Sequence, residues 1–259
     1  MSLEKEAPAL VIFTAPMGER AARVHVLTEA QGLTRGVAYG VTNQTARALW
    51  QLGNVVKTRM RQRGEGGILT FSGEVMEVYA VRLFEVPLAL DLVQSVCALL
   101  NTTLLEHDPC PFLWAQTLYF LASLCDLCKT HKRREDEVVP LYIRWEVLLL
   151  QTLGFGLDFS CCAVTGDREN LVYVSPRTGR AVSEDGAGIW RDRLLSLPEF
   201  LLTKEKKGAP FQWLEGLHLT GYFLQRHVYD QYHRPMPIIR QRLSERIKKL
   251  VRQTNARNS

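Results

Sequence analysis

Apolar and polar residues alternate along the first part of the chain, from about residue 9 to residue 79. The alternation is clear around Val24 and Val26 and again from Val56 to Met60, with the period of a strand that has one face in solvent. The apolar runs lie at 9–14, 23–30, 32–40, 52–62 and 68–79. So many short strands predict a closed barrel, because closure protects the edges of a small sheet. The OB-fold is the five-stranded barrel that this pattern favours.

After Pro87 the pattern changes to that of helices. Pro87 suits a first helical turn, and Gly154 suits a left-handed cap at the end of the third helix. The second helix carries one charge in its first seventeen residues, so it is expected in the middle of a bundle. The predicted helices are 88–106, 111–129, 140–154, 213–230 and 237–252.

A polar stretch from Leu153 to Ser183 interrupts the helices. Its middle, LVYVS, resembles a strand, and Gly166 and Gly179 each follow a threonine and suit turns with positive φ. We predict a small hairpin insert at 158–190. The expected fold class is α+β, with a five-stranded OB-fold β-barrel at 1–80 and a mainly α-helical domain at 81–259 that contains the insert.

The composition, with 46% apolar residues in 259, is sufficient for a substantial core. The N-terminal sequence MSLEKEAPAL has charges and a proline where a secretory signal would be apolar, and charged residues interrupt every long apolar stretch. We therefore expect a cytoplasmic protein without a membrane span, whose six cysteines are reduced thiols. The net charge of +5 is uneven, since residues 226–259 hold nine basic and two acidic groups.

The strongest chemical signal is a row of cations at alternate positions of one predicted strand, namely Lys57, Arg59, Arg61 and Arg63. All four project from one face, and no acidic residue occurs in 48–63. Like charges in line repel one another unless an anion lies across them, and OB-type sheets bind single strands through basic grooves with aromatic platforms. Trp50 and Tyr39 are candidate stacking side chains. The alternative is an ordinary solvated face that discourages edge pairing.

A possible metal site is suggested by the spacing of Cys125, Cys128 and His131. Buried packing is the favoured interpretation, because both cysteines lie in the most apolar helix and no second ligand pair is near in sequence. The chain contains no phosphate-binding loop, dinucleotide fingerprint, H-E-x-x-H motif or nucleophile elbow. We expect no enzymatic activity, no cofactor and no metal. The alternative is a metal-dependent enzyme built on Cys125, Cys128 and His131.

Three stretches resemble the RecO family of bacterial recombination mediators. The barrel section, with ALVIFT, RVHVLTEAQGLTRGV and LGNVV, resembles the family's opening domain. The segments LGFGLDFSCCAVTG and YVSPRTGRAVS resemble its central insert, and HLTGYFLQRHVYDQYHRPMPIIRQRL resembles its closing helices. The insert is the most specific of the three matches.

The resemblance implies a cytoplasmic, nucleoid-associated mediator that binds single- and double-stranded DNA. Members anneal complementary strands coated with single-stranded-DNA-binding protein and, with RecR, help to load RecA; RecF is a further indirect partner. The expected phosphate contacts are Arg35, Arg47, Lys57, Arg59, Arg61 and Arg63, with a secondary set of Arg240, Arg242, Arg246, Lys248 and Lys249. The alternative is an adaptor whose helical domain binds proteins and whose barrel does not anneal DNA.

The insert departs from the pattern of those members that hold zinc with four cysteines. Cys162 matches a first ligand, but Thr165 stands where the second would be. The segment from Ser183 to Gly186 offers no cysteine. We therefore expect a hairpin without zinc.

Overall fold

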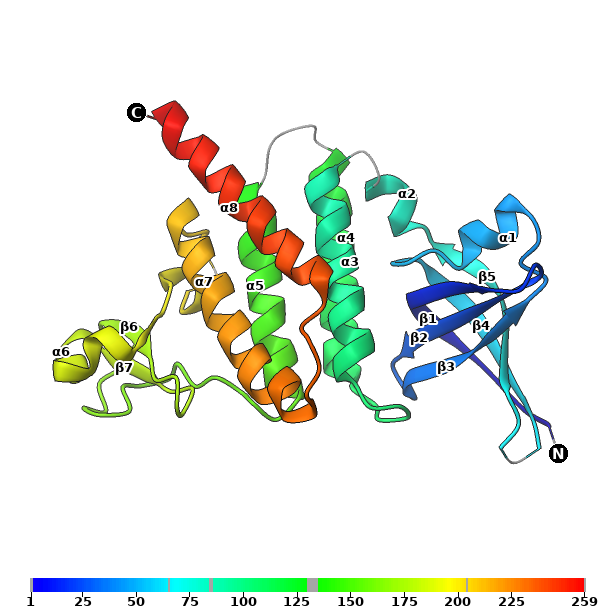
Figure 1. Cartoon of the computed structure of the whole chain (residues 1–259), viewed down its shortest axis with the longest axis horizontal. Helices are drawn as coiled ribbons and strands as arrows, with labels where there is room; N and C mark the ends of the chain where they lie inside the picture. Colours follow the sequence, from blue (N-terminus) through cyan, green and yellow to red (C-terminus); the bar gives the residue numbers. More distant parts are fainter. Residues whose placement is uncertain (1, 65, 84–85, 130–134, 204, 259) are drawn as a thin grey trace. The chain divides into compact units, whose positions relative to one another are not determined.

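The computed structural model describes residues 2–64, 66–83, 86–129, 135–203 and 205–258 (Figure 1). The chain forms two compact units, Met1–His131 and Lys132–Ser259. The first unit therefore contains two long helices in addition to the barrel. The expected functional boundary at residue 80 stays a prediction.

The first unit begins with a closed barrel, drawn in blue and cyan in Figure 1, whose strands follow the order β1-β2-β3-β5-β4. Neighbouring strands are antiparallel except for β3 and β5, which are parallel. Trp50 and Phe71 fill the interior together with Val24 and Met60. The strands are β1 (Ser2–Met17), β2 (Ala21–Thr28), β3 (Gly32–Tyr39), β4 (Val55–Arg63) and β5 (Leu69–Glu77). The predicted five-stranded barrel and the α+β fold class are confirmed.

The described part of the first unit also contains four helices: α1 (Gln44–Leu49), α2 (Tyr79–Leu83), α3 (Pro87–Thr103) and α4 (Pro111–Lys129). α3 packs on β1 and α4 packs on β2. As a result, Leu27 is fully buried and His25 is 9% exposed, although their alternation with Val24 and Val26 predicts that both lie on the solvent face of β2. That expectation was wrong, because the alternation shows which side chains share a face but not whether a helix covers it.

The second unit contains three long helices, α5 (Glu135–Thr152), α7 (Pro210–Leu224) and α8 (Ile238–Asn258). α7 packs against both of the others. The predicted helix 213–230 corresponds to α7 followed by a π-helical turn, η3 (Gln225–Tyr229), and a short 3-10 turn, η4 (Asp230–Tyr232).

The insert forms a three-stranded sheet in the order β7-β6-β8. The predicted strand is β6 (Leu171–Val174), which pairs with β7 (Ala181–Ser183) and β8 (Leu195–Ser196). Gly166 and Gly179 have φ of 82° and 71°, as their turns require. The short elements α6 (Glu184–Ala187), η1 (Gly188–Arg193) and η2 (Glu199–Leu201) complete the segment. The expected hairpin is thus present and gains a third strand.

Helix α5 begins at Glu135, five residues before the predicted start at Pro140. Three acidic residues occupy its first turn, where the positive end of the helix dipole favours them. The helix tolerates the missing N–H of Pro140 because the flanking side chains Val139 and Ile143 are fully buried. Its predicted end is close to the observed one, since Gly154 adopts φ of 84°.

Candidate nucleic-acid interface

The outer face of β4 carries the predicted row of cations. Lys57, Arg59 and Arg61 are exposed, whereas the alternate residues Thr58 and Met60 are buried in the barrel. The side chains of Lys57 and Arg59 are 54% and 51% exposed, so both charges reach solvent. Arg63, the last predicted member, ends β4, and its side chain lies outside the described residues. We call Lys57, Arg59 and Arg61 the β4 row.

Glu6 of β1 lies beside the β4 row. Its carboxylate is 3.5 Å from Lys57 Nζ and accepts a hydrogen bond from Arg59 Nε. That hydrogen bond and the two positive charges hold the pKa of the Glu6 carboxyl below its ordinary value. The strand pairing explains the contact, because Glu6 and Arg59 are directly opposed in the β1–β4 register.

Arg35 and Arg47, the other predicted barrel contacts, lie on separate elements. Arg35 is exposed on β3, and its Nη1 is 3.5 Å from Glu106 Oε2. The segment bearing Glu106 is fixed alongside β3 because the N–H of His107 donates to the Leu33 carbonyl at 3.0 Å. Arg47 is exposed on α1, a helix capped by the Asn43 side chain. The predicted phosphate contacts of the barrel domain are therefore distributed over β3, α1 and β4.

The two candidate stacking residues have opposite environments. Tyr39 at the end of β3 is 60% exposed, so its ring can accept a nucleobase. Trp50 is 3% exposed and lies in the barrel core, with its ring centroid 6.2 Å from that of Phe71. The prediction for Trp50 was wrong, because its side chain fills the barrel interior.

The structure also shows an aromatic and cationic cluster that the sequence reasoning missed. The ring of Phe13 stacks on His25 with centroids 4.4 Å apart, and the exposed guanidinium of Arg23 lies 5.5 Å from the Phe13 centroid. His25 Nδ1 is 2.6 Å from Asn101 Oδ1. Burial is the main reason that the pKa of His25 is lowered. The alternation of Arg23 and His25 in the sequence was the available signal.

Helix α8 carries the secondary set of predicted contacts. Four of its members, Arg242, Arg246, Lys248 and Lys249, are exposed. Lys248 lies 3.9 Å from Glu245, one turn earlier. The fifth member, Arg240, is 6% exposed and does not belong with the others.

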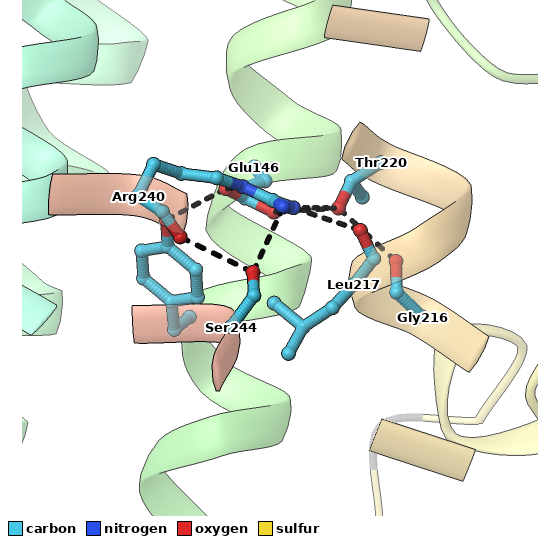
Figure 2. A network of polar contacts seen from close by, with 7 residues as sticks. Glu146, Gly216, Leu217, Thr220, Arg240 and Ser244 are labelled. Carbon is cyan, nitrogen blue, oxygen red and sulfur yellow. Dashed lines mark hydrogen bonds and ion pairs between the residues drawn. The ribbon is translucent and has the colours of Figure 1, made fainter. Parts of the chain in front are cut away.

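Arg240 is held in a buried network of polar groups (Figure 2). Its Nε and Nη2 each donate to Glu146 at 3.0 Å, and Nη2 also donates to the Leu217 carbonyl at 2.8 Å. Glu146 is fully buried and additionally accepts from Thr220 Oγ1 at 2.5 Å and from the Tyr142 hydroxyl at 2.6 Å. Burial disfavours the charge on Arg240, but the Glu146 carboxylate outweighs it and raises the pKa of the guanidinium. Arg240 is therefore a core residue, and its assignment as a phosphate contact is corrected.

The insert surrounds the Cys162 thiol with hydrogen-bond donors. Cys162 is 1% exposed, and its Sγ accepts from the N–H groups of Val164, Thr165 and Ser183 and from the Ser183 hydroxyl, at 3.2–3.4 Å. Burial raises the pKa of this thiol, but the hydrogen bonds outweigh burial and lower it to about 6. Across the described residues, no three side chains of the metal-binding types come together.

The second cysteine spacing is only partly visible. Cys125 is 2% exposed within α4, in agreement with buried packing. The Cys128 side chain and all of His131 lie outside the described residues. In the part of the chain that is described, no helix has the length and apolar character needed to span a membrane.

The closed five-stranded barrel, its exposed basic strand and the helices that follow define an OB-type protein of the α+β class. Two family profiles match the chain, "Recombination protein O N terminal" at residues 1–79 and "Recombination protein O C terminal" at residues 87–235. The chain belongs to the RecO family of DNA repair proteins, and its role lies in recombinational repair.

Curated relatives agree with this assignment along nearly the whole chain. DNA repair protein RecO of Gluconacetobacter diazotrophicus is 44% identical over 95% of both chains. The protein of the same name from Granulibacter bethesdensis is 40% identical over 96% of this chain and 97% of its own. That of Rhodospirillum centenum is 40% identical over 93% of both.

Proposed function

We propose that this protein is a non-enzymatic recombination mediator of the bacterial cytoplasm, associated with the nucleoid. It binds single- and double-stranded DNA and anneals complementary strands coated with single-stranded-DNA-binding protein. With RecR it helps to load RecA, and RecF acts indirectly. The observation that carries the proposal is the β4 row, whose three cations are exposed on one face of the barrel in a member of the RecO family.

Except for Arg63, whose side chain lies outside the described residues, the proposed DNA contacts follow from exposure. A phosphate can reach only those cations that lie at the surface, so Arg240 is omitted. The barrel contributes the main set because the β4 row aligns three exposed cations on one face, and α8 contributes the secondary set. The proposed contacts are Arg35, Arg47, Lys57, Arg59, Arg61 and Arg63, with Arg242, Arg246, Lys248 and Lys249 as the secondary set.

Annealing of complementary oligonucleotides coated with single-stranded-DNA-binding protein is the decisive experiment. The wild-type protein should accelerate pairing, and reversing the charges of the β4 row should abolish the acceleration. A matched variant with Arg242, Arg246 and Lys249 reversed changes the net charge equally and should retain most of it. If the wild-type protein leaves the rate of pairing unchanged, the mediator function is wrong.

An adaptor function is the second candidate, and one observation favours it. In the insert, Ile189 and Trp190 are 91% and 56% exposed, and large exposed apolar side chains are common at protein interfaces. An adaptor without DNA contacts would not accelerate pairing of bare complementary strands. The annealing experiment with uncoated strands therefore separates the two functions.

A metal-dependent enzyme built on Cys125, Cys128 and His131 is the remaining alternative. Its test is metal analysis of the purified protein. Stoichiometric zinc that is lost in a Cys125→Ala variant would support it, whereas a zinc content well below one per chain would reject it.

A further inference from the structure

The β4 row has a counterion within the protein. Glu6 reaches both Lys57 and Arg59, so two of the three cations in the row share one carboxylate. All three side chains are well exposed, at 42% for Glu6 and just above half for the cations. A phosphate that approaches either cation therefore meets an ion pair already formed on the open surface.

A second proposed contact is arranged in the same way. Arg35 on β3 faces Glu106, which comes from the segment after α3, and this pair is also exposed at 45% and 38%. At both positions the acid comes from a distant part of the sequence and approaches a cation of the barrel surface. Three of the proposed phosphate contacts of the barrel are thus each paired with a carboxylate.

We infer that Glu6 competes with DNA phosphate for Lys57 and Arg59 and thereby limits the affinity of the barrel for DNA. The inference rests on the proposed function, because it concerns the same row of cations. For phosphate to bind, the carboxylate must give up its two partners and remain beside a polyanion. Both effects oppose binding, and both diminish when the Glu6 charge is removed.

The contact is not required for the fold. Exposed ion pairs add little to stability, since water and salt screen them. β1 and β4 are instead held by a continuous backbone register that extends from Ser2 opposite Arg63 to Leu10 opposite Val55. A Glu6→Gln variant should therefore keep the barrel intact, and its Tm should match that of the wild type.

The competition has a consequence for strand annealing. A protein that brings two strands together must release the product, and release slows as affinity for each strand rises. By weakening the phosphate contacts of Lys57 and Arg59, Glu6 favours release. The Glu6→Gln variant should thus bind single strands more tightly while completing fewer annealing cycles per protein.

The test is the affinity for an oligothymidylate, measured by fluorescence anisotropy over a series of salt concentrations. For Glu6→Gln we expect about two- to thirtyfold tighter binding at low salt, the range in which loss of two exposed ion pairs falls. The plot of log K against log salt should steepen by about 0.7, the contribution of one further single-strand phosphate. Glu29→Gln, in the exposed β2–β3 turn, removes the same charge and should change both values much less.

A second experiment, in a protein that lacks Lys57 and Arg59, tests whether these are the cations for which Glu6 competes. In a Lys57→Met/Arg59→Met protein, Glu6→Gln should have little effect, because the cations for which Glu6 competes are gone. Equal affinities of wild type and Glu6→Gln would overturn the inference and leave DNA binding in place. The same applies if Glu29→Gln tightens binding equally, or if the effect persists in the Met background. If the wild type binds no DNA at all, the proposed function fails, and the inference fails with it.

Discussion

Strand β4 and helix α8 are both rich in arginine and lysine, yet their basic side chains differ in exposure to solvent. Every described cation of the β4 row is exposed, because a period of two places alternate side chains on one face. In α8 the helical period places Arg240 on the same face as Leu243 and Ile247, both of which are fully buried. A run of basic residues therefore forms an exposed face only where the period of its helix or strand keeps the side chains out of the core.

Glu146, the partner of the buried Arg240, also lies on an apolar face of its helix. Glu146 in α5 is flanked at helical spacing by Ile143 and Leu149, which are fully buried. A carboxylate and a guanidinium that each interrupt an apolar stripe can be accommodated together, because each satisfies the other in a medium that would penalise either alone. The sequence contains both interruptions, but only the packing of the helices shows that the two residues pair.

The largest expected effect is on stability, at Arg240. Arg240→Ala leaves the Glu146 carboxylate buried without its counterion and should lower the unfolding free energy by about 3–5 kcal/mol. Arg242→Ala, two residues away and exposed, should change it by less than about 0.5 kcal/mol. Urea denaturation measures both. Equal losses for the two variants would show that the distinction between core and surface on α8 is wrong.

The next largest effect is expected on DNA binding, at the β4 row. Replacing Lys57, Arg59 and Arg61 by Glu should weaken binding to DNA of any sequence by about 100-fold or more at low salt. The slope of log K against log salt for single strands should flatten by about 2, since about 0.7 is lost for each phosphate. Salt-dependent anisotropy measures both quantities. An unchanged slope would remove the β4 row from the DNA interface.

In the insert, the buried sulfur of Cys162 should also contribute to stability. Cys162→Ala leaves the N–H donors of Val164, Thr165 and Ser183 without an acceptor and should cost about 1–3 kcal/mol of stability. Cys161 is half-buried, and Cys161→Ala should have a much smaller effect. Thermal unfolding compares the two variants. A larger loss at Cys161 would contradict the hydrogen-bonded role of Cys162.

The same thiol predicts a dependence of stability on pH. Its pKa is lowered from 9.0 to about 6 in the folded protein, so folding favours the thiolate. The resulting stabilisation should be fully present above about pH 9 and should decrease as the pH falls toward 6. Cys162→Ala should remove this part of the dependence of Tm on pH. An identical pH profile in the variant would show that the thiol does not titrate in this way.

The smallest effect is expected at Tyr39. Tyr39→Leu should weaken single-strand binding about fivefold, the lower end of the range for loss of one stacked base. The salt slope should stay unchanged, since no phosphate contact is lost. Trp50→Leu serves as the contrast, because it should lower the stability of the barrel without acting on bound bases. A flattened salt slope for Tyr39→Leu would mean that its role is not stacking.

Sequence reasoning succeeded where one element decides the outcome. The strand pattern predicted the barrel, Gly154 and Gly179 marked turns with positive φ, and the alternation from Lys57 to Arg61 predicted a shared face. It failed where a second element decides. The pattern predicts a solvent-exposed face of β2 at Leu27, but packed helices cover that face. It also predicts a stacking role for Trp50 at the surface, but this side chain fills the barrel interior.

The sequence by itself therefore determined the types of element, their order and which side chains share a face, because these follow from local period and backbone preference. Only the tertiary structure decided which faces are open and which charges are already paired. Glu6 and Arg59 are 53 residues apart in the chain, and Glu146 and Arg240 are 94 apart. Such contacts depend on how separate elements pack, and no local pattern records that.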